Sequence, residues 1–321
     1  MSKVFTPNGG YAEVVQQSKC AVTGKVITTF SVKYGLIIHS ESLRHRTLSR
    51  GVKSNRAIPA SVIRKEVLND PYIPIWFGAN QSGMVAKSEV KYPKLAKALW
   101  LGARYPAVAA HWLAEKLLNG HKEWCNRLLN PWQWVRETIT ATEWDNFYNL
   151  RIHPDAQQDI QAIAKAMYSA ATNYSGCIEL RAGQWHVPYV VRAIEDLGGY
   201  TAIYYIDNDG SRLSTEQALK ASAARCARSS YDNHDKTKAT IKGDMKLWDQ
   251  LIESDPKHSS PVEHQATPTQ DVLSLDVNDD CWPKGVTHID YSGAVWSGNF
   301  CGWIQHRQLL DNHTCYNYQP S

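Results

Sequence analysis

The alternation of apolar and polar positions predicts strands early in the chain and helices in its middle. Residues 25–38 carry β-branched and aromatic residues in partial alternation, which is typical of one or two strands. Residues 93–129 have apolar residues at helical spacing, so we expect helices there with a break near Pro106. A further amphipathic helix, with Pro154 in its first turn, is predicted by the stripe Ala156, Ile160, Ile163, Ala164, Met167 and Ala171.

Helices and strands continue to interleave in the second half. Ser214 and Gln217 have the spacing of a capping box, which predicts that a helix begins there and runs through Ala227. A strand-like segment ends at the Asn208-Asp209-Gly210 turn. Residues 256–283 are rich in Pro, Ser, Thr and Asp, and we expect a long surface loop. The predicted fold class is therefore α/β, of the mixed α+β kind with irregular interleaving.

Composition excludes several classes of protein. Of the 321 residues, 43% are hydrophobic and 21% are charged, as in a globular protein with a packed core. The net charge of +4 is too mild to indicate nucleic-acid binding by charge alone. No apolar run has the length of a signal peptide or a membrane span, so no membrane association is expected. The seven scattered cysteines contain no CxxC pair, which favours a reducing, cytosolic compartment without structural zinc or disulfides.

The densest chemical signal is a basic stretch at residues 43–56. Five cationic side chains fall within thirteen residues, with no carboxylate among them: Arg44, Arg46, Arg50, Lys53 and Arg56. Guanidinium groups match phosphate oxygens in pairs, and the intervening Ser and Gly residues let backbone N–H groups approach the same oxygens. A solvated basic loop is an equally good interpretation of such a cluster taken alone.

Two further segments combine polar residues at close spacing. Residues 258–264, HSSPVEH, contain His258, Ser260 and Glu263, but Pro261 prevents the regular helix that would align the two histidines on a metal. Hydrogen bonding to a cofactor, or a simple turn, fits this segment better, and no metal is expected. The segment that ends in Arg151 contains two asparagines that on their own indicate a turn.

Together these segments resemble the motifs of the flavin-dependent thymidylate synthases. The matching strings are Arg44-His45-Arg46 followed after seven residues by Ser54, Asn146-Phe147-Tyr148-Asn149-Leu150-Arg151, Ala227-Arg228-Ser229-Ser230-Tyr231, and His258-Ser259-Ser260-Pro261-Val262-Glu263-His264. Further strings are similar to the longer, phage-type branch, in which the last of these motifs follows the first. The resemblance implies one catalytic unit over residues 1–321, with motif segments 25–59, 121–173, 214–268 and 296–310.

The resemblance also implies a reaction, its cofactors and an assembly. Members of the family convert dUMP to dTMP, with FAD as cofactor and with NADPH and methylenetetrahydrofolate as co-substrates, in homotetramers whose active sites lie at subunit interfaces. Residues matching the FAD-binding positions are Arg44, His45, Arg46, Asn146, Ser230, His258, Ser260 and Glu263. Residues matching the positions that bind the deoxypyrimidine monophosphate are Arg44, Ser54, Asn55, Arg56 and Arg151, and Arg151 matches the residue that activates the pyrimidine. The implied location is the cytoplasm, of the host if the protein is phage-encoded.

Several positions depart from the family pattern and leave alternatives open. Glu41 stands where a glutamine is usual, Gly51 falls where a polar residue is usual, and Asn55 is also a departure. A carboxylate at position 41 would repel a phosphate unless the neighbouring arginines neutralise it. One alternative is therefore hydroxymethylation of dUMP or dCMP for DNA modification. A second is a non-catalytic nucleic-acid-binding protein that uses the basic stretch.

Overall fold

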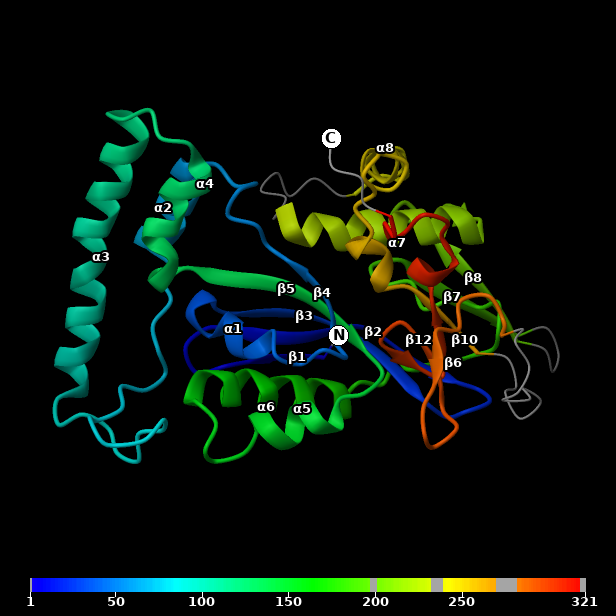
Figure 1. Ribbon diagram of the computed structural model, residues 1–321, viewed down its shortest axis with the longest axis horizontal. Helices are drawn as coiled ribbons and strands as arrows, with labels where there is room; N and C mark the ends of the chain where they lie inside the picture. Colours follow the sequence, from blue (N-terminus) through cyan, green and yellow to red (C-terminus); the bar gives the residue numbers. More distant parts are fainter. Residues whose placement is uncertain (1, 197–200, 232–238, 270–281, 318–321) are drawn as a thin grey trace.

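Helices and strands interleave along the whole chain, which confirms the predicted α/β class (Figure 1). The computed structural model describes residues 2–196, 201–231, 239–269 and 282–317. Its largest sheet has the order β1 (Lys3–Phe5), β2 (Tyr11–Cys20), β3 (Val26–Gly35), β5 (Trp134–Ala141), β4 (Ser49–Val52), with antiparallel pairs throughout. β6 (Ile178–Leu180) adds to β2 in parallel. The strand predicted within residues 25–38 is β3, and a short 3-10 helix, η1 (Leu36–Ile38), ends it.

One face of this sheet packs on helix α6 (Gln158–Thr172), with α5 (Asp145–Arg151) beside it (Figure 1). The predicted apolar stripe is confirmed, because Ile160, Ile163 and Met167 are buried against the sheet. The helix begins later than expected. The side chain of Gln157 accepts hydrogen bonds from the N–H groups of residues 159 and 160, so it caps the helix and leaves Pro154 in the preceding turn.

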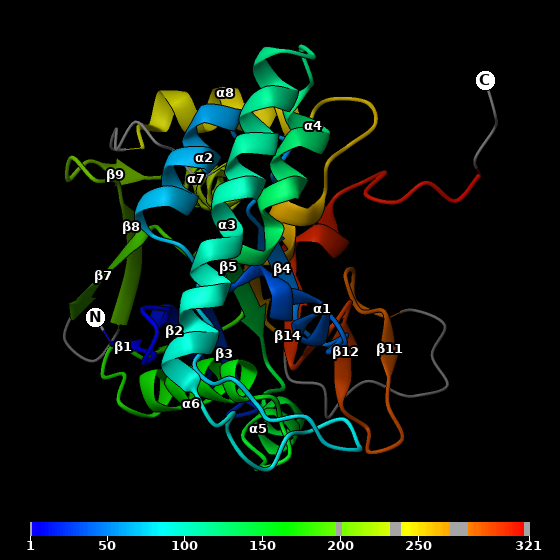
Figure 2. The ribbon, with the colours of Figure 1, turned by 90° about the vertical axis from the view of Figure 1, so that its left-hand side faces the viewer.

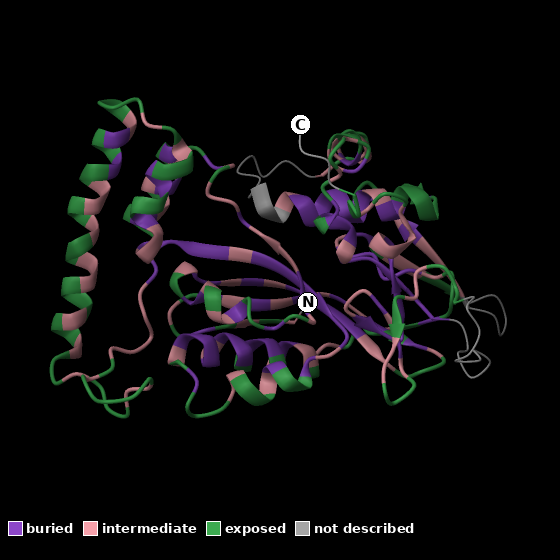
Figure 3. Cartoon of the chain, viewed as in Figure 1, coloured by how far each residue is buried: buried purple, intermediate pink, exposed green. Residues whose placement is uncertain are grey.

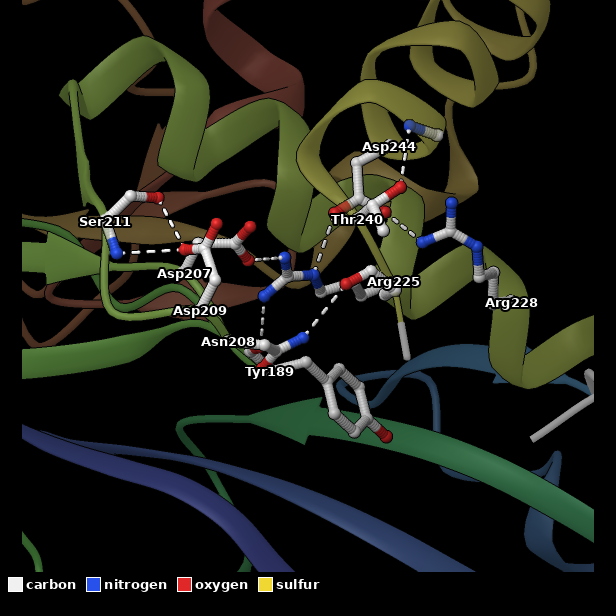
Figure 4. Close-up of polar contacts among 11 residues, drawn as sticks. Tyr189, Asp207, Asn208, Asp209, Ser211, Arg225, Arg228, Thr240 and Asp244 are labelled. Atoms are coloured by element: carbon white, nitrogen blue, oxygen red, sulfur yellow. Dashed lines mark hydrogen bonds and ion pairs between the residues drawn. The ribbon is translucent and has the colours of Figure 1, made fainter. Parts of the chain in front are cut away.

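The opposite face is covered by α7 (Thr215–Tyr231), with α8 (Ile241–Leu251) above it (Figure 1). The predicted capping box is confirmed, since Ser214 and Gln217 exchange side chain to backbone hydrogen bonds of 2.9 and 3.1 Å. Arg225 of α7 lies between Asp244 of α8 and Asp207, the residue after β8, and joins the three elements (Figure 4). α7 is thus held by ionic contacts as well as by apolar packing.

Three small sheets complete this side of the molecule. They are β7 (Val191–Asp196) with β8 (Thr201–Ile206) and β9 (Arg212–Leu213), β10 (Ala266–Pro268) with β14 (Trp303–Gln305), and β11 (His288–Ile289) with β12 (Val295–Ser297) and β13 (Phe300–Cys301). The turn predicted at Gly210, which has φ +89°, separates β8 from β9.

The expectation of a long surface loop over residues 256–283 was wrong for its first half. Residues 260–263 form the 3-10 helix η3 (Ser260–Glu263), and β10 follows it. Val262, His264 and Ala266 are fully buried there, because the chain passes between α7 and the sheet. Residues 270–281 lie outside the described part of the chain.

A helical group stands at one end of the sheet, formed by α2 (Ala60–Asn69), α3 (Pro93–Lys116), α4 (Lys122–Cys125) and η2 (Asn126–Trp132) (Figure 1). The predicted break at Pro106 was wrong, and α3 continues through it. Pro106 cannot donate to the carbonyl of Gly102, but both residues are exposed, so water can satisfy that carbonyl. Much of the outer face of α3 is exposed, and it carries Leu95 and Leu99 at 56% and 65% exposure (Figure 3).

Candidate active site

The predicted motif segments meet at strands β4 and β5. β4 follows the Arg44-His45-Arg46 segment, and its Ser49 pairs in register with Thr140 of β5, which precedes Asn146. On the same face of the sheet, Thr140 Oγ1 lies 2.9 Å from His264 Nδ1. Gln305 Nε2 lies 3.2 Å from Ser49 Oγ and donates to the backbone carbonyl of Glu263 at 3.1 Å. Segments about two hundred residues apart are therefore in direct contact.

His45 and Arg151 form the central contact between two of the predicted motifs. Arg151 Nε donates to His45 Nε2 at 2.9 Å, and the imidazole meets the ring of Phe147 edge to face at 5.0 Å. A guanidinium can only donate, so Nε2 is the acceptor and the imidazole is neutral. Burial, together with the charges of Arg151 and Arg50, lowers the pKa of His45 to about 4. His45 therefore stays neutral at physiological pH and orients Arg151.

Glu41, which could repel a bound phosphate if its charge were uncompensated, lies beside Arg151. Arg151 Nη2 donates to the Glu41 backbone carbonyl at 3.0 Å, and its Nη1 is 3.6 Å from the Glu41 carboxylate. The carboxylate is thus compensated by this guanidinium. The same contacts attach the end of α5 to the turn that carries Arg44 and Arg46.

Only part of the basic stretch is available to a ligand, because carboxylates from other elements pair with three of its five cations. Arg50 lies 2.8 Å from Glu137 of β5, Lys53 2.7 Å from Glu66 of α2, and Arg56 3.4 Å from Glu123 of α4. The Arg56 pair is highly exposed, so it holds its partners weakly. Arg44 and Arg46 are exposed and have no ion pair or hydrogen bond to any residue that the structure describes. These two cations remain free to bind an anion.

Ser54, Asn55 and Arg56 line one cavity of about 280 Å³ at the far end of β4. Asn55 Nδ2 donates to Asn130 Oδ1 at 3.0 Å, and Ser54 Oγ accepts from the Arg56 backbone N–H at 3.3 Å. The cavity also contains Arg127 of η2, which sequence reasoning missed. No pattern marked it, since a single arginine in a helical segment is usually solvated. The arrangement gathers two exposed guanidiniums around a small opening.

The segment at residues 258–263 is fixed by the C-terminal part of the chain. Glu263 forms an ion pair with Arg307, while burial raises the pKa of Glu263 against the opposing effect of that guanidinium. His258 and Ser260 expose their side chains. The described part of the chain shows no hydrogen bond or ion pair between them and Arg44, His45 or Arg46.

The remaining two predicted FAD ligands, Asn146 and Ser230, lie on helices α5 and α7. Asn146 is exposed in the first turn of α5, five positions before Arg151. Ser230 belongs to the last turn of α7, but its side chain lies outside what the structure describes.

A buried chain of hydrogen bonds crosses the sheet and ends beside the 258–263 segment. Its links, of 2.6 to 2.9 Å, join Arg192, Ser18, His186, Thr29, Thr140 and His264 in that order. Arg192 can only donate a hydrogen bond, so it donates to Ser18. If each hydroxyl then donates to the next group in the series, Thr140 donates to His264 Nδ1, and the hydrogen of the neutral His264 ring lies on Nε2. That nitrogen is buried and has no partner in the described part of the chain. An orphaned donor here, with free cations at Arg44 and Arg46, fits a group rich in acceptor and phosphate oxygens such as FAD.

Metal and membrane sites have no support in the described residues. No group of three His, Cys, Asp or Glu side chains there is placed to hold a metal ion. None of the helices described combines the length and the apolar character needed to cross a membrane.

Comparison with known proteins finds structural likeness only. No family model and no curated protein matches the chain. A crystal structure of flavin dependent thymidylate synthase ThyX from Helicobacter pylori, complexed with FAD and dUMP, is similar over 45% of this chain and 67% of that chain, with 17% identity and a TM-score of 0.31. A UMP/dUMP methylase PolB from Streptomyces cacaoi, bound with 5-Br dUMP, is similar over 54% and 94%, with 13% identity and a TM-score of 0.43. At such low identities and TM-scores, the likeness does not assign a role to any residue.

Proposed function

We propose that this protein is a flavin-dependent enzyme that alkylates the pyrimidine ring of a deoxynucleotide, and that its reaction is the reductive methylation of dUMP to dTMP. The observation that carries the proposal is the 2.9 Å contact between His45 and Arg151. It joins the two motif segments that the reaction requires at one place, although 106 positions separate them. When bound, FAD supplies the hydride that completes the methyl group, after reduction by NADPH, while methylenetetrahydrofolate supplies the carbon.

Arg151 is the residue we assign to activation of the pyrimidine. Neutral His45 and the Glu41 carbonyl hold its guanidinium in place, and it stays charged through the physiological range. A fixed cation beside the ring stabilises the negative charge that develops when the ring ionises. The structure supports this role because the guanidinium is oriented by neighbours, so little rearrangement is needed at the moment of reaction.

The nucleotide phosphate is assigned to the cavity formed by Ser54, Asn55 and Arg56, with Arg127 as an additional ligand. Two guanidiniums and a hydroxyl around one opening match the oxygens of a phosphate monoester. Arg56 leaves its weak, exposed pair with Glu123 at low cost when a dianion binds. FAD is assigned to Arg44, His45, Arg46, Asn146, Ser230, His258, Ser260 and Glu263.

A homotetramer with active sites between subunits completes the proposal. His258 and Ser260 are exposed, so they are accessible to a ligand that a neighbouring copy also contacts. The exposed apolar face of α3, with Leu95, Leu99 and Leu113, offers a surface for assembly (Figure 3).

The decisive experiment combines an absorption spectrum with product analysis. The purified protein is expected to be yellow, with flavin bands, and to convert dUMP into dTMP when methylenetetrahydrofolate and NADPH are present. Mass analysis of parallel incubations with dUMP and dCMP separates methyl from hydroxymethyl products. A hydroxymethylated product would show that the reaction is the alternative, hydroxymethylation, and not methylation. A colourless protein that binds DNA in a salt-sensitive way would overturn the enzymatic proposal altogether.

A further inference from the structure

One sizeable cavity lies away from every residue assigned above. It is a cleft of about 950 Å³ bounded by β1, β2, the segment after α6, and the start of β7. Figure 2 shows β1, β2 and β7 on the same side of the molecule, near the N-terminus. None of the residues assigned to FAD or nucleotide lines this cleft. Its volume is within the range of sites that enclose small organic molecules.

Arg192 is the charged group in the wall of this cleft that lacks a counterion. Its Nη1 donates to Ser18 Oγ at 2.6 Å and its Nη2 to the Gln17 carbonyl at 3.0 Å, which uses two of the five N–H groups of a guanidinium. No Asp or Glu carboxylate of the described residues lies within 4.0 Å of it. Burial lowers the pKa of Arg192 to about 10, as expected for an enclosed cation without a compensating anion.

Two other enclosed guanidiniums, those of Arg50 and Arg225, are compensated by carboxylates. Arg50 has a carboxylate oxygen at 2.8 Å and Arg225 has one at 2.9 Å. Because an enclosed charge without a partner is costly, proteins pair such groups or use them to bind a charged ligand. Arg192 has no such carboxylate among the described residues, and it lines a cleft that the chain leaves open.

The remaining charges near the cleft neutralise one another. Lys3 and Glu13, which both line it, form a pair at 3.1 Å. Lys19 pairs with Glu179 at 3.7 Å on the neighbouring strand edge. The net charge presented to a ligand is therefore that of Arg192. Tyr174 and Val191 supply apolar surface beside it.

We propose that this cleft is a second ligand site, and that it takes a small organic anion whose carboxylate or phosphate group binds Arg192. Carboxylates and phosphates share the paired oxygens that a guanidinium fork recognises. The apolar wall accommodates the body of the molecule. This site is independent of the proposed function, since it needs neither flavin nor pyrimidine nucleotide.

The test is calorimetric titration of the full-length protein with two probes, inorganic phosphate and glutarate, at low ionic strength in a chloride buffer. Saturable binding of at least one probe is expected, and the probe that binds identifies the acidic group. Arg192→Gln is expected to weaken that binding by about 10- to 100-fold, the effect of removing a charge-assisted contact. The matched control, Lys19→Gln, removes an exposed cation on the neighbouring strand and should leave the affinity unchanged.

A second variant covers the case in which Arg192→Gln fails to fold. Val191 lines the cleft and is 53% exposed, so Val191→Trp fills the opening without disturbing the core and should also abolish binding. Absence of binding by both probes, or equal affinity in wild type and Val191→Trp, would overturn the proposal. A colourless protein without synthase activity that still bound phosphate or glutarate through Arg192 would refute the proposed function and leave this site intact.

Discussion

Replacement of Arg225 by methionine tests whether the ionic contacts of α7 stabilise the fold. Arg225 is 5% exposed and donates to Asp244 at 2.9 Å, to the Tyr189 carbonyl at 3.0 Å, and to Asp207 (Figure 4). Asp244 is fully buried and also accepts from Arg228. Removing Arg225 leaves Asp207 without this partner in a buried site and Asp244 with one partner fewer.

The expected loss of folding free energy follows from the contacts that Asp207 and Asp244 lose. Breaking a buried ion pair by removing one member destabilises a protein by about 3–5 kcal/mol, because the other charge stays buried and uncompensated. For a chain of this size each kcal/mol corresponds to about 2 °C in Tm, so Arg225→Met should lower Tm by about 6–10 °C. Urea denaturation followed by circular dichroism gives the free-energy difference directly, provided that the transition is two-state.

A matched substitution on the same helix supplies the control. Lys220 pairs with Glu216 at 2.8 Å in an exposed pair, so Lys220→Met should cost less than about 1 kcal/mol. Adding Asp207→Asn to Arg225→Met should recover part of the loss, since it removes the uncompensated charge. Equal destabilisation by Arg225→Met and Lys220→Met would refute the reasoning.

Four further outcomes are expected. Arg151→Ala should abolish turnover while the protein stays yellow; normal turnover would remove Arg151 from the mechanism. Arg127→Ala should raise the KM for the nucleotide about 10-fold with kcat little changed, as steady-state kinetics would show. Burial lowers the pKa of His264 and His306 from 6.5 to about 4, so their stabilising effect is complete above pH 6.5 and declines toward pH 4. At pH 5 each histidine should lower the free energy of unfolding by about 2 kcal/mol relative to its value at pH 7. A urea denaturation midpoint that does not change between pH 7 and pH 5 would contradict this. Leu99→Glu on α3 should reduce the mass measured by light scattering, whereas an unchanged mass would exclude this face from assembly.

Local features of the fold could be predicted because their causes are local. The alternation in β3, the apolar stripe of α6 and the capping box of α7 each depend on residues within a few positions of one another. The errors came where a neighbour in space decided the outcome. The sequence around residues 256–269 has a polar composition, yet most of residues 261–269 are buried because α7 and the sheet enclose them.

The basic stretch shows the same limit for the candidate site. Sequence reasoning found no carboxylate among its five cations, which is correct for the segment and misleading for the molecule. Glu137, Glu66 and Glu123 come from β5, α2 and α4, and strand pairing or helix packing places each beside one cation. Arg127 was missed for the corresponding reason, since only the folded chain places it in the cavity with Arg56.

The distribution of counterions separates structural cations from those available to ligands. Arg50 and Arg225 are enclosed and compensated, so their charges serve the fold. Arg44 and Arg46 are exposed and lack partners among the described residues, and they flank the histidine that orients Arg151. Arg192 is half-buried, has no carboxylate of the described residues within 4.0 Å, and lines the cleft of about 950 Å³. Because an uncompensated cation costs free energy where water is partly excluded, binding of an anion that the fold does not itself supply should be favourable at Arg192.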